Sequence, residues 1–292
     1  MDFLICVIII SLILIILLYY LYYFEIPRYI NLSNKNWNDV INLDKKYHHI
    51  PRVKCKRRVV ISMTTIPSRL NKIAPTLCSI LTQNRRVDEI RLNIPYKSMK
   101  GDKYHIPKCF KKFKNIKIHR IETDLGPSTK LLPTLKDERD SNIIVIDDDM
   151  IYGSKLVQKL VYSFIKHKEK IVVTYYGCNK RDGKLDRTWK FLQGDEYVYL
   201  LFGCGGYILK GDMLPDEVFD YENGPEEAKF VDDNWISGWL WLNGIKIYTL
   251  GVHNSTMYLP SQGTFGTDSL CNTVNWDKKN CHIVDKWFER QK

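Results

Sequence analysis

The chain has 292 residues, of which 45% are hydrophobic and 26% are charged, so its length and composition suit a globular protein and exclude a wholly disordered one. Its formal net charge of +11 is concentrated in two basic runs, at 54–58 and 97–120. No zinc-finger or RNA-binding aromatic signature accompanies these runs, so we expect a solvated lysine-rich face and no nucleic-acid partner. The eight cysteines form no CxxC motif and predict neither a zinc site nor a disulfide framework.

The first 25 residues have the character of a transmembrane anchor. Residues 3–24 contain no charged side chain, and several tyrosines gather at the end of this run, like the aromatic belt of a membrane interface. About 20 apolar residues in a helix span the roughly 30 Å hydrocarbon layer of a bilayer. A cleaved signal peptide would have a basic start, a shorter apolar core and small residues at a cleavage site. We therefore expect a single-pass N-terminal anchor, 1–25, that inserts residues 3–24 into the lipid bilayer.

The orientation of this anchor stays open. Basic residues such as Arg28 and Lys35 follow the span, and the positive-inside tendency would place the rest of the chain in the cytosol. Long domains cross membranes regardless of charge, however, and sequons at Asn31 and Asn254 matter only if this side is luminal. The polar segment 26–56 is expected to be an irregular stem, followed by a domain that covers 57–292.

Beyond the stem, short apolar runs alternate with segments of helical periodicity. This alternation predicts an α/β fold with a mostly parallel sheet sandwiched by helices, and with ligands bound at the carboxyl ends of the strands. The expected strands are 58–64, 89–94, 116–121, 142–146, 170–175 and 246–250, and the expected helices are 68–82, 128–140, 156–168 and 233–242.

The strand expected at 142–146 runs directly into three consecutive aspartates, Asp147, Asp148 and Asp149. Like charges held this close resist burial unless something compensates them. A divalent cation that prefers oxygen ligands, Mg²⁺ or Mn²⁺, would do so, and alternate residues of an extended segment place Asp147 and Asp149 on one face. The alternative is a solvated acidic turn that caps the next helix. An apolar strand leading into the triplet favours a metal or nucleotide-sugar site.

The stretch from about 58 to 255 resembles the GT-A glycosyltransferase fold, which is Rossmann-like, and within it the broad family-2-like group. In that group a strand ends in a DxD motif that holds a metal ion and the nucleotide diphosphate of a sugar donor, and the aspartate triplet takes this place. The resemblance implies that Asp147 contacts the ribose or the metal, that Asp148 belongs to the donor site, and that Asp149 is a direct metal ligand. His253, after the last expected strand, matches the position of a third metal ligand.

Two segments before the triplet match the donor half of that family. Thr65 and Arg69 lie in the loop after the first expected strand, where the resemblance implies contacts to the base or the diphosphate. Asp124 and Lys130 flank a Gly-Pro-Ser-Thr run, where it implies a base or ribose contact for Asp124 and a phosphate contact for Lys130. Both segments are also typical of ordinary structure, a strand–helix turn with Pro67 at a helix start and a turn followed by an N-cap.

The second half of the chain matches the acceptor side of the family. Gly205 and Gly206 belong to a glycine-rich segment of the kind that lies beside the sugar and the acceptor, although a tight bend between strands also uses glycine. Asp232 and Asp233 open an expected helix, where the family carries its general base. We assign this role to Asp233, the second acid, and an acceptor contact to Asp232, while acids there also cap helices. Trp235 is a candidate for stacking on a sugar, but helical tryptophans more often lie in the core.

The sequence therefore predicts a metal-dependent glycosyltransferase that moves a sugar from a UDP- or GDP-sugar to a hydroxyl of a glycan, protein or lipid acceptor, with inversion. One alternative is a haloacid-dehalogenase-like phosphohydrolase, although its Asp-x-Asp follows a first strand and not a fourth. Another is a catalytically inactive GT-A-like binding protein. The family-2 donor loop and its Gln-x-x-Arg-Trp segment are not evident. The abundance of Ile, Lys, Asn and Tyr suggests an AT-rich genome, such as that of a giant virus.

Overall fold

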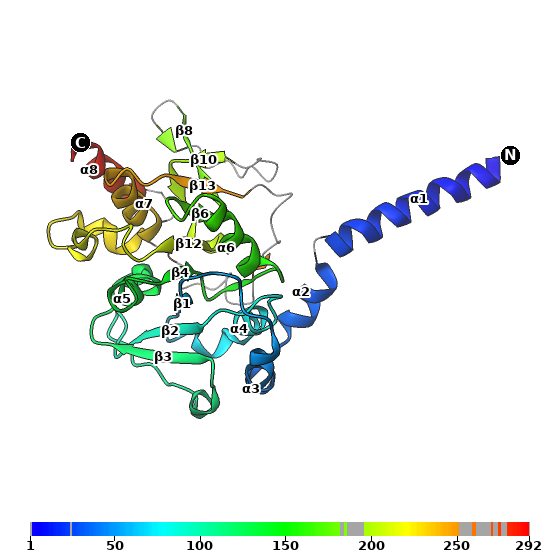
Figure 1. The fold of residues 1–292 in the computed structure, drawn as a ribbon, viewed down its shortest axis with the longest axis horizontal. Coiled ribbons are helices and arrows are strands. Elements are labelled where there is room, and N and C mark those ends of the chain that lie inside the picture. Colours follow the sequence, from blue (N-terminus) through cyan, green and yellow to red (C-terminus); the bar gives the residue numbers. More distant parts are fainter. Residues whose placement is uncertain are drawn as a thin grey trace.

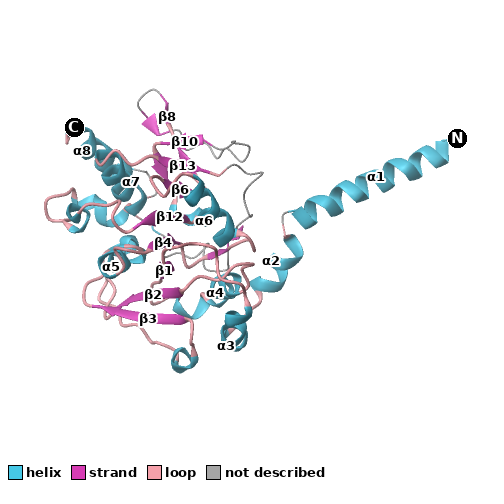
Figure 2. Ribbon diagram, viewed as in Figure 1, coloured by secondary structure: helices cyan, strands magenta, loops and turns pink. Residues whose placement is uncertain are grey.

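The computed structural model describes residues 2–23, 25–181, 184–185, 196–250, 259–260, 270, 274–275 and 279–291. An eight-stranded sheet runs through the middle of the body with helices on both sides, and the first helix projects away from it (Figure 1). Figure 2 shows the same arrangement coloured by secondary structure. The α/β class predicted from the sequence is confirmed.

The eight strands form one mixed sheet. Their order is β10 (Glu196–Val198), β13 (Ile247–Thr249), β6 (Val172–Thr174), β12 (Tyr207–Lys210), β4 (Asn142–Val145), β1 (Val59–Thr64), β2 (Glu89–Pro95) and β3 (Ile116–Ile121). β1 pairs in parallel with β2 and β4, and β2 pairs in parallel with β3. β12 is antiparallel to both of its neighbours, while β13 is parallel to β6 and antiparallel to β10. β4 therefore lies between a parallel half and an antiparallel neighbour, at the centre of the sheet.

Helices cover the sheet and connect its strands. The α-helices are α1 (Asp2–Tyr23), α2 (Ile26–Ser33), α3 (Trp37–Lys46), α4 (Ala74–Leu81), α5 (Leu132–Asp137), α6 (Leu156–Lys166), α7 (Asp232–Leu242) and α8 (Lys279–Arg290). Short 3-10 helices are η1 (Tyr47–His49), η2 (Leu70–Lys72), η3 (Lys108–Lys112), η4 (Gly126–Lys130), η5 (Gly203–Gly205), η6 (Asp216–Phe219) and η7 (Glu226–Phe230). Two-residue strands are β5 (Met150–Ile151), β7 (Gly177–Cys178), β8 (Lys180–Arg181), β9 (Lys184–Leu185), β11 (Leu200–Leu201) and β14 (Leu259–Pro260).

Two helices begin later than the apolar periodicity predicts, and proline explains both. The pattern predicts a helix over 68–82, but α4 begins at Ala74, with Pro75 in its first turn. It also predicts a helix over 128–140, but α5 begins at Leu132 and again carries a proline in its first turn. Proline is tolerated there because that N–H has no helical partner, whereas deeper in a helix it removes a hydrogen bond and clashes with the preceding turn. The 3-10 helices η2 and η4 occupy the preceding residues.

The segment 26–56 is not the irregular stem that its polar composition predicts. α3 begins with a capping box, in which the Asn36 side chain accepts from the backbone and the Asp39 carboxylate accepts the Asn36 N–H at 3.0 Å. Farther along this helix, the fully buried Asp44 accepts the N–H of Lys114, just before β3, at 2.7 Å. Local capping therefore forms the helix, and a few buried contacts fix it against the domain.

The described side chains of α1, residues 5–21, are apolar or aromatic apart from one serine, and nearly all of them are exposed. Among the described residues no single helix is both long and apolar enough to cross a membrane. Ile5–Leu21 together with Ile26–Ser33, which meet at an angle of 51°, reach that length and composition as a bent pair.

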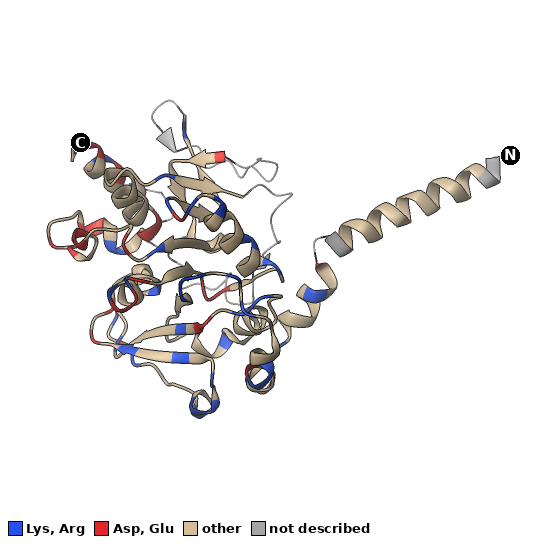
Figure 3. Ribbon diagram, viewed as in Figure 1, with Lys and Arg blue, Asp and Glu red and all other residues tan. Residues whose placement is uncertain are grey.

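Charge is distributed unevenly over the body (Figure 3). All the lysines between 97 and 117, around β2, β3 and η3, are exposed, which agrees with the expectation of a solvated basic face. Acidic residues gather instead around η6, η7 and the start of α7 (Figure 3). A basic segment around β3 and η3 and an acidic segment around η6 and η7 therefore lie on different parts of the surface.

Candidate functional site

An acidic turn follows the central strand β4 and is held by the loop after β1. Asp148 is only 4% exposed, and its Oδ2 accepts the Thr65 hydroxyl at 2.5 Å. Arg69 Nη2 lies 3.1 Å from Asp148 Oδ1, and Arg69 Nη1 donates to Asp149 Oδ2 at 2.8 Å. Thr76, which the sequence did not single out, donates through its hydroxyl to the Asp148 carbonyl at 2.8 Å. Thr65 and Arg69 thus meet the acidic triplet, as the strand-end positions predict.

Two carboxyl groups of the turn keep raised pKa values despite these partners. Burial raises the pKa of Asp148, although Arg69 and the Thr65 hydroxyl oppose this. Burial also raises the pKa of Asp149 to about 7, and the charges of Asp148 and Asp147 add to the rise. A group of carboxylates with one pKa so far from its ordinary value favours additional positive charge at this place.

Lys130 joins the acidic turn to the second half of the chain. It is 5% exposed, and its ammonium lies 2.7 Å from Asp147 Oδ1 and 3.0 Å from Asp232 Oδ2. Burial alone would lower the pKa of Lys130, but the charges of Asp147, Asp232 and Asp233 outweigh it and hold this pKa well above its ordinary value. The buried Ser62 hydroxyl on β1 donates to the Lys130 carbonyl and fixes the end of η4. Lys130 is therefore a permanently charged link between two acidic segments.

Asp233 lies in the first turn of α7, on the other side of Lys130. Its Oδ1 accepts the Gly203 N–H at 2.9 Å. A Cβ atom on Gly203 would lie 2.6 Å from Lys130 Nζ and 3.0 Å from Asp233 Oδ1, so the close approach of both groups requires glycine. Burial raises the pKa of Asp233 to about 7, the charge of Asp232 adds to this, and Lys130 opposes it. A carboxyl group with this pKa exchanges protons readily near neutral pH.

Tyr152 connects the acidic turn to the glycine-rich segment, a role that no pattern in the sequence indicates. The residue is completely buried, and its hydroxyl accepts the Asp147 N–H at 2.9 Å and donates to the Cys204 carbonyl at 3.1 Å. A tyrosine that follows an apolar pair is ordinary core composition. Only the three-dimensional fold shows that its hydroxyl bridges two loops.

Two of the predicted site residues have structural partners. Asp124 Oδ2 accepts the Met99 N–H at 2.9 Å and Asp124 Oδ1 accepts the Gly126 N–H at 2.9 Å, so this side chain joins two loops, and its contact with a base or ribose stays a prediction. Trp235 is completely buried, and its indole N–H donates to the Val218 carbonyl at 2.9 Å. The prediction that Trp235 stacks on a sugar does not fit this position, because a ligand cannot reach a ring enclosed by the core.

Of the remaining predicted site residues, the two glycines lie in the described part of the chain and the histidine does not. Gly205 and Gly206 lie beside the site, separated from Gly203 by Cys204, and Gly206 has a φ of +81°, a left-handed conformation that favours glycine. His253 lies outside the described residues, so its role as a metal ligand stays a prediction. Within the part of the chain that the structure describes, no three His, Cys, Asp or Glu side chains form a group that could hold a metal ion.

No protein-family model and no curated protein matches this chain. Among solved structures it is similar to S. aureus TarS 1–349, with 16% sequence identity and a TM-score of 0.43 over 66% of this chain and 60% of that one. It is likewise similar to the same protein in complex with UDP, with 19% identity and a TM-score of 0.44 over 66% and 58% of the two chains. The chain thus matches less than two thirds of TarS 1–349. Likenesses of this extent carry no argument about function.

Proposed function

We propose that this chain is a metal-dependent glycosyltransferase of the GT-A type, with a nucleotide-sugar donor and an acceptor hydroxyl. The observation that carries the proposal is the convergence of two acidic segments on one buried lysine. Asp147, at the carboxyl end of β4, and Asp232, at the start of α7, both pair with Lys130. Ligands of open α/β sheets bind at this edge, and the DxD resemblance implies a donor at the same place.

The donor side of the proposed site contains two cations suited to a diphosphate. Arg69 and Lys130 lie beside the acidic turn, and each is paired with an aspartate carboxylate. A guanidinium can bind two phosphate oxygens at once, and an ammonium supplies a compact charge. We therefore assign the diphosphate of a UDP- or GDP-sugar to Arg69 and Lys130, and the ribose to Asp147. Thr65 and Asp148 act behind them, because their mutual hydrogen bond fixes the turn.

The residues of the turn fit a divalent cation. The side chains of Asp147 and Asp149 are 27% and 16% exposed, so their carboxylates are accessible to an ion, and both supply the hard oxygen ligands that Mn²⁺ and Mg²⁺ prefer. Burial raises the pKa of Asp149 to about 7 and the charges of Asp148 and Asp147 add to it, which supports a cation at this place. A bound ion would neutralise charge on the departing diphosphate. Asp147 and Asp149 would hold it, with His253 as the further ligand that the resemblance implies.

Asp233 is suited to the role of general base. Gly203 orients its carboxylate through the backbone N–H, and its pKa of about 7 allows it to accept a proton from an acceptor hydroxyl. As the hydroxyl oxygen forms a bond to the anomeric carbon, the bond to the diphosphate breaks and the proton passes to Asp233. A single in-line displacement of this kind inverts the anomeric configuration. Asp232 stays paired with Lys130 and faces the acceptor side, where a glycan, protein or lipid hydroxyl would enter.

The deciding experiment is nucleotide-sugar hydrolysis by the full chain in detergent micelles, across a panel of UDP- and GDP-sugars, with Mn²⁺ or with EDTA. We expect release of the nucleoside diphosphate from one donor class, with at least a tenfold loss in EDTA and in Asp149→Asn. Asp212→Asn is the matched control, because this acid is 59% exposed and pairs with Lys210 on the surface. A rate of hydrolysis that is the same in EDTA as in Mn²⁺, or no hydrolysis of any donor, contradicts the proposal. Release of phosphate from a phosphomonoester would instead favour a phosphohydrolase.

We also propose that α1 anchors the protein in a membrane as a single pass. The support is its composition, since the described side chains of 5–21 include no charge and nearly all are exposed. Flotation of the full chain with phosphatidylcholine liposomes tests this. Protein that stays at the bottom of the gradient, or that carbonate extracts from the liposomes, would contradict the anchor.

A further inference from the structure

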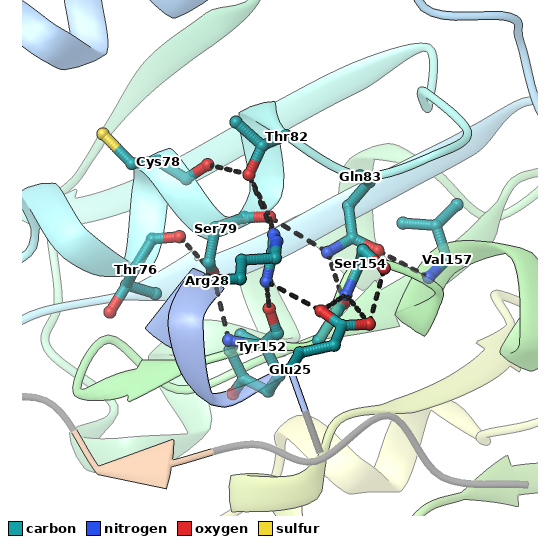
Figure 4. Close-up of polar contacts among 11 residues, drawn as sticks. Glu25, Arg28, Thr76, Cys78, Ser79, Thr82, Gln83, Tyr152, Ser154 and Val157 are labelled. Atoms are coloured by element: carbon teal, nitrogen blue, oxygen red, sulfur yellow. Dashed lines mark hydrogen bonds and ion pairs between the residues drawn. The ribbon is translucent and has the colours of Figure 1, made fainter. Parts of the chain in front are cut away.

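The bend between α1 and α2 is fixed to the domain by a carboxylate. Glu25, at the bend, has a φ of +53°, a left-handed conformation that is uncommon for a residue other than glycine. Its two carboxylate oxygens accept the Ser154 N–H at 2.9 Å and the Ser154 hydroxyl at 2.6 Å (Figure 4). A strained backbone persists only where surrounding contacts over-determine it. The bend therefore has a built contact with the loop that follows β5.

Arg28, one turn into α2, makes a second and deeper contact with the same region. Its guanidinium donates to the Tyr152 carbonyl at 2.6 Å, to the Ser79 carbonyl at 3.0 Å and to the Thr82 hydroxyl at 2.8 Å (Figure 4). It also lies 3.5 Å from the Glu25 carboxylate. A guanidinium that donates hydrogen bonds to three separate acceptors fixes the positions of these acceptors relative to one another. Arg28 thus ties α2 both to α4 and to the loop 152–154.

The same loop touches the proposed donor site through the other end of Tyr152. While the Tyr152 carbonyl accepts from Arg28, its hydroxyl accepts the Asp147 N–H at 2.9 Å and donates to the Cys204 carbonyl at 3.1 Å. A single buried residue therefore separates the helix that follows the apolar segment from both loops of the site. Its ring is completely enclosed, so a displacement of its backbone moves its hydroxyl as well.

We infer that Arg28 is a positioning residue of the donor site, which acts through Tyr152 on the backbone of Asp147 and Cys204, and that Glu25 supports it by binding Arg28 and Ser154. The expected effect on catalysis rests on the proposed function, whereas the expected effect on the acidic turn does not. In structural terms, the segment that contains Glu25 and Arg28 helps to hold the site in place, and does more than connect α1 to the domain. Both the position of α2 and the geometry of the acidic turn depend on one set of contacts around 152–154.

The test compares full-chain variants in phosphatidylcholine nanodiscs. Arg28→Met keeps the length of the side chain and removes its donors. Lys35→Met is the matched control, because Lys35 follows α2 closely in the sequence but pairs with Asp39 at the start of α3. We expect Arg28→Met to accelerate amide hydrogen exchange in peptides covering 145–153 about tenfold, and to leave peptides of β2 unchanged, because local opening would be confined to the loop. Lys35→Met should exchange like the unmodified chain in both regions.

Two further measurements keep the inference falsifiable. Tyr152→Phe, which keeps the ring and removes only the hydroxyl, should reproduce the faster exchange at Asp147 while the α2 contacts remain. In nucleotide-sugar hydrolysis, both variants should lose about tenfold in kcat with a smaller change in KM, because the turn is misplaced while Arg69 still binds the donor. If amide hydrogen exchange in peptides covering 145–153 is equally fast in Arg28→Met and Lys35→Met, the inference is wrong. If no chain hydrolyses any donor, the proposed function fails, and the exchange comparison still decides this inference.

Discussion

The acidic turn at 147–149 and the acidic pair at 232–233 lie on opposite sides of Lys130, yet their remaining partners differ in kind. The turn is bound by side chains, since Arg69 contacts two of its carboxylates and Thr65 donates a hydroxyl to the buried one. The pair receives a backbone N–H from Gly203. Side-chain cations hold negative charge in place, whereas a backbone amide orients a carboxyl group without neutralising it.

Each segment contains one carboxyl group with a pKa of about 7, and the partners of these two groups separate their roles, because Arg69 binds Asp149 and the Gly203 N–H binds Asp233. For Asp149, burial comes first and two neighbouring aspartates follow, a crowding that a cation would relieve. For Asp233, burial also comes first and the charges of Asp232 and Asp147 add to the rise, but Lys130 and the Gly203 N–H oppose it. We infer that the first segment lacks a cation and that the second accepts a proton. The two roles predict different responses to substitution, since a lost cation ligand changes the need for Mn²⁺ and a lost base changes kcat.

Removing the shared lysine should have the largest effect, because both segments depend on it. Lys130→Met leaves Asp147 and Asp232 without their common cation, and breaking a buried pair of this kind costs about 3–5 kcal/mol of the free energy of unfolding. Hydrolysis of the donor should fall below detection. Urea denaturation of the full chain in detergent measures the first effect. Lys210→Met, which removes the cation of a surface pair, is the control and should stay within about 1 kcal/mol of the unmodified chain. Equal losses in the two variants would show that neither acidic segment relies on the buried charge.

Replacing Asp233 should separate proton transfer from binding. Asp233→Asn keeps an oxygen that can accept the Gly203 N–H but cannot take a proton, so kcat should fall by about 10²–10⁴-fold. The dissociation constant for UDP, measured by calorimetry in the presence of Mn²⁺, should change less than about twofold. Asp149→Asn should instead weaken the binding of UDP in the presence of Mn²⁺, and a higher Mn²⁺ concentration should be needed for half-maximal activity. If Asp233→Asn raised the Mn²⁺ requirement instead, the roles assigned to the two segments would have to be exchanged.

The pH dependence gives a smaller but more specific effect. Burial and Asp232 raise the pKa of Asp233 to about 7, so its basic form is lost as the pH falls through that value. At saturating Mn²⁺, kcat should therefore rise with pH up to about 7 and then level off, with a tenfold loss for each unit below. The residual activity of Asp233→Asn should lack this acidic limb. A limb whose midpoint moves with the Mn²⁺ concentration would belong to Asp149, because a cation competes with the proton there.

The sequence predicted the fold best where one local pattern determines the structure. The strand expected at 116–121 is β3 without a shift, because an alternating run between polar segments leaves little choice. Thr65 and Arg69 follow β1 and Lys130 follows β3, and these residues meet the acidic triplet after β4 at one edge, since parallel strands end together. Helix starts were less accurate, because prolines inside an apolar periodicity move the boundary although the pattern continues through them.

The remaining features depend on contacts between residues far apart in the chain. Glu25 and Ser154 are 129 positions apart, and nothing near either residue indicates that they meet. The polar composition of 26–56 resembles a linker because its buried contacts are few and include the charged Asp44. Trp235 failed as a site residue for a related reason, since periodicity cannot tell a core tryptophan from an exposed one on a helix that is mostly buried.

The smallest predicted effect tests whether the buried member of the acidic turn is charged. The Thr65 hydroxyl donates to the carboxylate of Asp148, whereas the Thr64 hydroxyl, one residue earlier, donates to the neutral carbonyl of Asn93 at 2.8 Å. Thr65→Val should lower the free energy of unfolding by about 1.5–3 kcal/mol and Thr64→Val by about 0.5–1.5 kcal/mol, because hydrogen bonds to ionised groups are stronger. Thermal and urea denaturation of both variants measure the difference. Equal losses would mean that Asp148 is neutral in the folded protein, since burial outweighs the opposing effects of Arg69 and Thr65 on its pKa. The turn would then carry one negative charge fewer than the comparison with 232–233 assumes, and its need for a cation would fall accordingly.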